Sequence, residues 1–146
     1  MPTEITPLKK VLAETHPGSV SPTILLVEDD SSVRDLVTRL LMMQGYKVLV
    51  AESGRAALPI WEEHKRDIDV LLTDVVMPQG IGGRELANRC QADKSHLQVI
   101  YTSGYNVELS TQSGWLRDGI QFVQKPYRPE QLLQAVRTAV SQTQNH

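Results

Sequence analysis

The chain has 146 residues and a formal net charge of -2, with 40% hydrophobic and 22% charged residues. This length suits one domain with a real core, and the slight acidity argues against a nucleic-acid-binding surface, which would be basic. No apolar run approaches the roughly 20 residues of a membrane span, and the first residues lack the layout of a secretory signal. The single cysteine, Cys90, permits no intrachain disulfide, so we expect a cytoplasmic protein without membrane contact.

The chain begins with a segment that differs from the rest. Residues 1–21 are rich in proline and have little periodicity, so we expect a tail or linker with a short helical turn near residues 8–14. Residues 22–146 form the expected domain. In it, short apolar runs typical of strands alternate with segments of helical periodicity. The expected strands cover residues 24–28, 47–51, 69–74, 97–102 and 120–124.

The first two expected helices have clear starts. One is capped by Asp30 or Ser31 and ends near Gly45. The other starts after Ser53 and contains Pro59, which we expect to kink or shorten the helix. Their inward faces are predicted by residues three and four apart. These are Val33, Leu36, Val37, Leu40 and Leu41 in the first helix, and Ala57, Ile60 and Trp61 in the second.

The remaining helices differ in strength. Residues 84–91 predict a third helix, with Cys90 on its apolar face. Residues 106–119 are poor in helix formers, so we expect a short or frayed fourth helix there. The last helix begins at Pro129, a first-turn position that tolerates proline. Strands that alternate with helices indicate βαβ units, a parallel sheet and right-handed crossovers.

One strand carries a carboxylate that needs an explanation. Residues 70–78 are almost all apolar, which is typical of a parallel strand buried on both faces. Asp74 would be costly in the middle of such a strand, so we expect it at the carboxyl end, before the loop that Pro78 starts. Glu28-Asp29-Asp30 and Lys125 follow two other strands. Because the carboxyl ends of parallel strands share one edge, these residues predict a polar site there.

The residue types at this edge fit one kind of chemistry. Carboxylates brought close together resist ionisation unless a cation compensates them. Asp29 and Asp74, with Glu28 beside them, offer the hard oxygen ligands that Mg²⁺ prefers. Lys125 suits a phosphate oxygen, and Ser103 supplies a hydroxyl group. A carboxylate nucleophile with these partners is suited to phosphoryl transfer onto an aspartate.

Four motifs together resemble the receiver domain of two-component response regulators. They are Val27-Glu28-Asp29-Asp30, Thr73-Asp74-Val75-Val76-Met77-Pro78, Thr102-Ser103-Gly104 and Lys125-Pro126. The resemblance covers residues 23 to about 141. It implies an α/β fold that is flavodoxin-like (CheY-like): a doubly wound five-stranded parallel sheet of order 2-1-3-4-5 with helices on both faces.

The resemblance also implies a function and roles for single residues. The chain is expected to be a phosphoacceptor module of a phosphorelay, which receives a phosphoryl group from the phosphohistidine of a histidine kinase or phosphotransfer domain and catalyses only its own phosphorylation and dephosphorylation. It is expected to act as a monomer, with a cis bond before Pro126 and no output domain after His146. The implied roles are Asp74 as phosphoacceptor, Glu28, Asp29, Asp74 and the Val76 carbonyl as Mg²⁺ ligands, Ser103 and Lys125 as catalytic groups, and Ser103 and Phe122 as switch residues.

Some features depart from the common receiver pattern. The loop of residues 77–83 is one residue longer, and Thr102-Ser103-Gly104-Tyr105 replaces the commoner Thr-Ala pair. These variants resemble the receivers at the C-terminus of hybrid sensor histidine kinases. The glycines of this loop lack the spacing of a phosphate-binding loop, so we interpret it as a flexible connection.

Two other functions compete with this interpretation. A phosphatase of the haloacid dehalogenase type also uses a strand-end aspartate and Mg²⁺, but it needs a second aspartate where this chain has Val76. A receiver-like fold used only for binding is disfavoured because Asp29, Asp74 and Lys125 are all present. Core packing alone would account for Phe122, which alternates with apolar neighbours in its strand.

Overall fold

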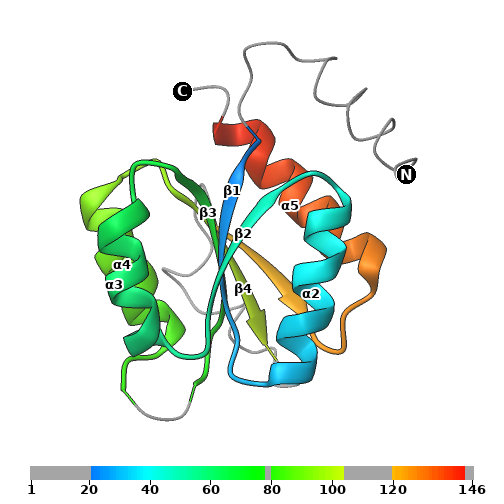
Figure 1. Ribbon diagram of the computed structural model, residues 1–146, viewed down its shortest axis with the longest axis horizontal. Coiled ribbons are helices and arrows are strands. Elements are labelled where there is room, and N and C mark those ends of the chain that lie inside the picture. The colour runs from blue at the N-terminus through cyan, green and yellow to red at the C-terminus, as the bar shows by residue number, and fades with distance from the viewer. Residues whose placement is uncertain (1–20, 78–79, 104–119, 144–146) are drawn as a thin grey trace, which may run out of the picture.

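The computed structural model describes residues 21–77, 80–103 and 120–143. Five parallel strands form one sheet in the order β2-β1-β3-β4-β5, with their arrowheads at the lower edge in Figure 1. The strands are β1 (Thr23–Val27), β2 (Lys47–Ala51), β3 (Ile68–Asp74), β4 (Gln98–Ser103) and β5 (Ile120–Gln124). The helices are α2 (Ser31–Met43), α3 (Gly54–His64), α4 (Gly83–Asp93) and α5 (Pro129–Thr143).

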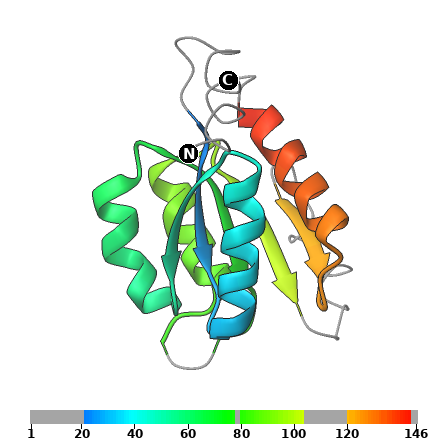
Figure 2. The same ribbon diagram turned by 45° about the vertical axis from the view of Figure 1, so that its right-hand side comes forward.

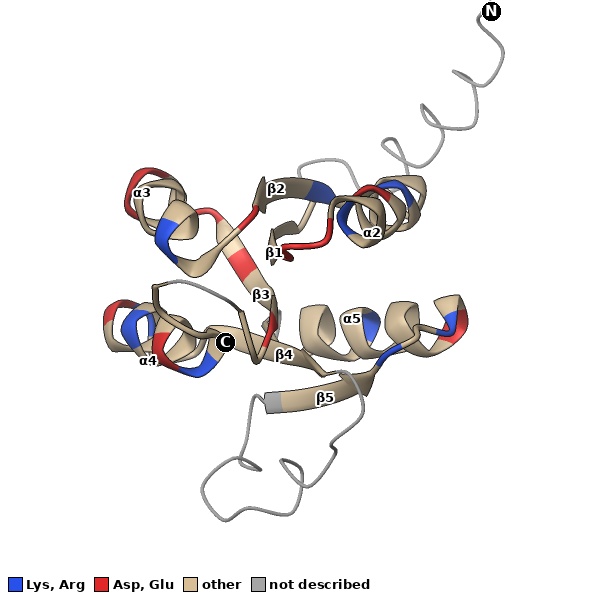
Figure 3. Cartoon of the chain, turned by 90° about the horizontal axis from the view of Figure 1, so that it is seen from below, with Lys and Arg blue, Asp and Glu red and all other residues tan. Residues whose placement is uncertain are grey.

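Helices cover both faces of the sheet. Helices α2 and α5 lie on one face and α3 and α4 on the other, as the view along the strands shows (Figure 3). Neighbouring strand residues point to opposite faces. Leu25 and Leu71 therefore pack toward α3 and α4, while Leu26 and Leu72 pack toward α2 and α5. Because both faces are covered, the central strands are apolar throughout instead of alternating.

The predicted strand order is confirmed, and with it the position of the switch point. From β1 the chain moves outward to β2, and then crosses back to place β3 on the other side of β1. The chain then continues through β4 to β5 at the far edge (Figure 2). The crevice at the carboxyl ends of β1 and β3 is therefore the place where folds of this type bind ligands.

Two expectations about the helices were wrong. Leu36 is 49% exposed, whereas Val37 and Leu41 are fully buried, because α2 contacts the sheet along a narrower stripe than its apolar residues suggested. Pro59 does not shorten α3, which continues to His64. The proline is itself exposed, and buried Ala57 and Trp61 hold the helix against the sheet on either side of it.

Two of the predicted segments lie outside the residues that the structure describes. Residues 1–20 of the expected tail and the expected weak helix of residues 106–119 are not among the described residues. Among the helices that are described, none combines the length and the apolar character needed to cross a membrane.

Candidate functional site

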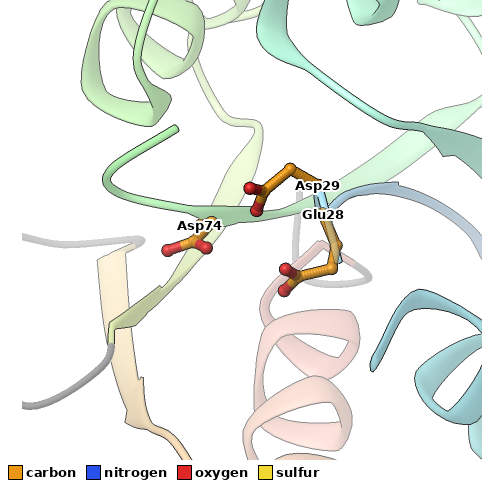
Figure 4. A group of neighbouring side chains, drawn as sticks. All are labelled: Glu28, Asp29 and Asp74. Carbon is orange, nitrogen blue, oxygen red and sulfur yellow. The ribbon is translucent and has the colours of Figure 1, made fainter. Parts of the chain in front are cut away.

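Three carboxylates gather at the carboxyl edge of β1 and β3. Glu28 and Asp29 directly follow β1, and Asp74 is the last residue of β3. The two strands are paired up to Val27 and Thr73, so these residues are side by side. One carboxylate oxygen of each residue lies within 4.8 Å of the others. Figure 4 shows the three side chains gathered at this point.

Lys125 brings a positive charge to this cluster from the far strand. It directly follows β5, and its Nζ atom lies 2.8 Å from Glu28 Oε1 and 2.9 Å from Asp74 Oδ2. Its backbone N–H donates to the carbonyl oxygen of Ser103 at 2.7 Å, and the peptide bond to Pro126 is cis, as expected. The side chain therefore spans the end of β4 to reach residues of β3 and β1.

Burial disfavours the charged forms of the ionisable groups at this site. Glu28 is 1% exposed and Asp74 is 8% exposed. Burial raises the pKa of both carboxyl groups, and the neighbouring Lys125 ammonium offsets part of that increase. Burial also disfavours the charged form of Lys125, yet its contacts with Glu28 and Asp74 hold the lysine pKa above its usual value. One ammonium is thus shared between two buried carboxylates, with a third carboxylate close by.

The donor set fits a divalent cation with hard ligand preferences. All three residues offer carboxylate oxygens, the ligands that such cations bind. Glu28 Oε1 is buried, and its compensation is the Lys125 ammonium, whose Nζ atom lies 2.8 Å away. An additional cation would relieve the repulsion among carboxylates that otherwise disfavours their ionisation. Glu28, Asp29 and Asp74 can therefore hold a metal ion.

The adjacent aspartates Asp29 and Asp30 have different roles. Asp30 caps α2, since its Oδ1 atom accepts hydrogen bonds from the backbone N–H groups of Ser32 and Val33 at 3.0 and 3.3 Å. Asp29 instead joins the carboxylate cluster. The structure thus selects Asp30 over Ser31 as the helix cap.

Gly83, at the junction between the loop after β3 and α4, lies close to the end of β3. The backbone N–H of Gly83 donates to the carbonyl oxygen of Val75 at 2.9 Å. A Cβ atom at Gly83 would lie 2.0 Å from the carbonyl oxygen of Asp74. The glycine lets α4 begin directly against the end of β3, where a side chain would displace Asp74. The sequence interpretation did not assign this role to Gly83.

Comparisons with known proteins agree on one family. A family model described as the response regulator receiver domain matches residues 24–137. The sensor kinase CckA of Brucella abortus (strain 2308) is 34% identical over 119 residues, or 82% of this chain. The chain belongs to the response regulator receiver domain family. Such domains are the phosphoacceptor modules of two-component phosphorelays, and they work with histidine kinases or phosphotransfer proteins.

Solved structures of receiver domains share the fold. The receiver domain from the hybrid histidine kinase CckA is 36% identical, with a TM-score of 0.68, and the match covers 81% of this chain and 98% of that domain. A receiver domain protein from Clostridium thermocellum is 27% identical, with a TM-score of 0.75 and coverage of 84% and 97%. The expected likeness to hybrid-kinase receivers is confirmed. The chain spans 12% of the length of the Brucella kinase.

The expected switch residues of this receiver domain lie in the neighbouring strands β4 and β5. Ser103 is buried at the end of β4. Phe122 is half-buried in β5 beside Tyr101 of β4, with ring centroids 5.5 Å apart. It also packs against the core under α3 and α4, which is the placement that core packing alone predicts.

Two side chains near the site were not singled out from the sequence. Arg34 donates from Nη1 to the carbonyl oxygen of Glu28 at 2.8 Å. Tyr127 hydrogen-bonds with the Thr102 side chain, and burial raises the tyrosine pKa to about 12. Neither residue belongs to a motif that the sequence interpretation used. Their positions depend on how α2 and the segment after β5 pack against the strand ends.

Proposed function

We propose that Asp74 is the residue of this receiver domain that accepts the phosphoryl group, that Mg²⁺ is required, and that the donor is the phosphohistidine of a histidine kinase or phosphotransfer domain. The observation that carries the proposal is the arrangement around Asp74. It is a strand-end carboxylate with a lysine ammonium at 2.9 Å and two more carboxylates next to it.

The environment of Asp74 suits a nucleophile. Its carboxylate oxygen attacks the phosphorus atom while the P–N bond of the donor breaks, and the imidazole leaves with the electron pair and takes up a proton. The attacking group must be ionised. Burial opposes this by raising the Asp74 pKa, whereas Lys125 and the backbone N–H of Val76 support the charged form. Lys125 can also stabilise the charge on the transferred phosphoryl oxygens.

The metal ligands in this proposal are Glu28, Asp29, Asp74 and the backbone carbonyl of Val76. Mg²⁺ binds few protein carboxylates and keeps open positions for water or phosphate, which fits a site of this composition. When bound, it neutralises negative charge on the phosphoryl oxygens. The residues of the chain supply the rest: they bind the metal, orient the nucleophile and offer the Ser103 hydroxyl as a donor to the phosphoryl group.

A conformational change completes the proposal. Ser103 would move toward the new phosphoryl group, and Phe122 would change its packing in response. Support comes from their positions: Ser103 is the last residue of β4, and its carbonyl oxygen accepts a hydrogen bond from the backbone of Lys125, while Phe122 lies in the middle of the neighbouring strand β5.

The chemistry of the site favours a phosphoacceptor over a phosphatase. A haloacid-dehalogenase-type enzyme needs an acid/base aspartate two residues after the nucleophile. Here that residue is Val76, whose side chain is 73% exposed and cannot transfer a proton. We therefore infer that the chain catalyses only its own phosphorylation and dephosphorylation. We also infer a cytoplasmic location, because a single cysteine permits no intrachain disulfide.

Incubation with phosphoramidate and Mg²⁺, followed by intact mass measurement, tests the proposal. The full chain should gain the mass of one phosphoryl group, and the gain should be lost in EDTA. Peptide mapping after borohydride reduction should locate the modification at Asp74. A label on any other residue, or a gain that is independent of a divalent cation, would refute the assignment.

A further inference from the structure

The segment that carries Asp29 is held by a residue outside the family motifs. Asp29 lies between Glu28 and Asp30, in the turn that connects β1 to α2. Asp29 is exposed, unlike buried Glu28. Its position in the carboxylate cluster therefore depends on the backbone of the turn more than on side-chain packing.

Arg34 contacts the backbone on both sides of Asp29. Its guanidinium Nη1 donates to the carbonyl oxygen of Glu28 at 2.8 Å, and its backbone N–H donates to the carbonyl oxygen of Asp30 at 2.8 Å. The first bond orients the peptide group that precedes Asp29. The second belongs to the first turn of α2 and would form with any residue except proline at this position. The side chain is thus the part of Arg34 that acts on Asp29.

The peptide group between Asp29 and Asp30 also forms a hydrogen bond. The backbone N–H of Asp30 donates to Glu28 Oε2 at 3.1 Å. Glu28 is a proposed metal ligand, and this bond uses one of its two carboxylate oxygens. The Arg34 bond makes no such demand, because it uses a carbonyl oxygen. It is therefore the contact that can keep the turn in place while the carboxylates bind a cation.

Arg34 holds the turn without using a carboxylate. A guanidinium bonded to the backbone of Glu28 places a fixed positive charge beside a cluster of three carboxylates. Arginine stays charged at all relevant pH values. Because its hydrogen bond is to the main chain, the guanidinium occupies none of the carboxylate oxygens that a cation would need.

We propose that Arg34 is a positioning residue that sets the Mg²⁺ affinity of this site by fixing the peptide group before Asp29. The inference rests on the proposed function, because it takes Glu28, Asp29 and Asp74 as the metal ligands. Residues that orient metal ligands from outside the first shell typically change metal affinity by about 10- to 100-fold when they are removed.

Titration calorimetry with MgCl₂ on the full chain tests this role. Arg34→Met keeps the apolar stem of the side chain and removes the donor, so the Mg²⁺ dissociation constant should rise about tenfold. Arg34→Lys, which keeps a charge and one donor, should recover part of the loss. Arg39→Met is the matched control, because Arg39 is exposed on the same helix, and it should bind Mg²⁺ like the wild type.

A second measurement separates positioning from general destabilisation. The phosphorylation rate with phosphoramidate should fall for Arg34→Met at low Mg²⁺ and return to near the wild-type rate at saturating Mg²⁺. A rate that stays low at saturation would overturn the inference, as would unchanged Mg²⁺ affinity in Arg34→Met. If that variant does not fold, Arg34→Leu, which also lacks the donor, replaces it, and a dissociation constant equal to that of the wild type refutes the role. A wild-type chain that binds no Mg²⁺ would refute the proposed function as well, so the two failures are distinguishable.

Discussion

The carboxyl ends and the amino ends of the parallel strands use the same residue types in different ways. At the carboxyl edge, Lys125 contacts two carboxylates, Glu28 and Asp74. At the amino end of β3, Lys94 donates from Nζ to the backbone carbonyl oxygens of Lys65, Arg66 and Ile68. Both lysine side chains are half-buried. Burial alone therefore does not distinguish the lysine that contacts carboxylates from the lysine that contacts backbone carbonyl groups.

The two aspartates of β3 show the same contrast. Asp69, near the start of the strand, accepts a hydrogen bond from the backbone N–H of Thr23 at 3.0 Å. Asp74, at the end, faces other carboxylates and one shared ammonium. Charged groups that form hydrogen bonds with the backbone stabilise the fold and require no further partner. Charged groups that face one another leave excess negative charge, which a ligand can use.

The largest effect should separate Asp74 from Asp69. Asp74→Asn removes the proposed nucleophile and should abolish the mass gain from phosphoramidate. Asp69→Asn keeps an oxygen that can accept from Thr23 and should be phosphorylated like the wild type. Intact mass spectrometry of both variants is the measurement. A phosphorylated Asp74→Asn protein would show that the contrast between the two aspartates is false.

The two lysines should differ in what they affect. Lys125→Met removes the cation that we propose stabilises the transferred charge, so phosphorylation should slow about a hundredfold. Lys94→Met leaves backbone carbonyl groups without their donor and should lower the free energy of unfolding by about 2 kcal/mol. Stopped reactions analysed by mass, together with urea unfolding, measure both quantities. The contrast fails if Lys94→Met slows phosphorylation as strongly as Lys125→Met.

Asp29 and Asp30 offer a comparison between adjacent residues. Asp29→Asn should weaken Mg²⁺ binding at least about tenfold, with an equal or higher melting temperature in EDTA because carboxylate repulsion is relieved. Asp30→Ala removes the helix cap and should cost about 1 kcal/mol of stability, with unchanged Mg²⁺ affinity. Calorimetry and thermal unfolding test the pair. The same loss of Mg²⁺ affinity in both variants would contradict the separation of their roles.

The smallest effect is a pH dependence of the metal-free protein. Burial raises the pKa of Glu28 above its usual 4.5 and that of Asp74 above 3.8. The folded state then binds protons more tightly than the unfolded state, so stability falls as the pH rises from these usual values through the raised folded-state values. In EDTA, the urea midpoint of the wild type should decrease over this range.

Glu28→Gln is the control for this pH effect. It removes one of the two raised carboxyl groups, so its stability relative to the wild type should increase as the pH rises. Lys125 contributes equally throughout this range, because its pKa is raised further from an already high value. A stability difference that does not change with pH would mean that Glu28 ionises normally in the folded state.

Much of this protein could be predicted from local patterns. The order of strands and helices follows from periodicity, because apolar runs and helical spacing depend on neighbouring residues alone. The meeting of Glu28, Asp29, Asp74 and Lys125 at one edge follows from a parallel sheet, whose strands all end on the same side. The outcome for Asp74 was the clearest, since a carboxylate in an apolar run has one favourable position, at the end of the strand.

Packing between segments decided the remaining features. The backbone conformation of the turn between β1 and α2 places Asp29 in the carboxylate cluster and Asp30 at the helix cap. The exposure of Leu36 depends on how α2 rests on the sheet. The reach of Lys125 across the end of β4, the bond from Arg34 to Glu28 and the closeness of Gly83 to Asp74 likewise join segments that are separate in the sequence. Local spacing determines the type of each segment, whereas contacts between segments depend on the distances at which their backbones pack, and no local pattern contains those distances.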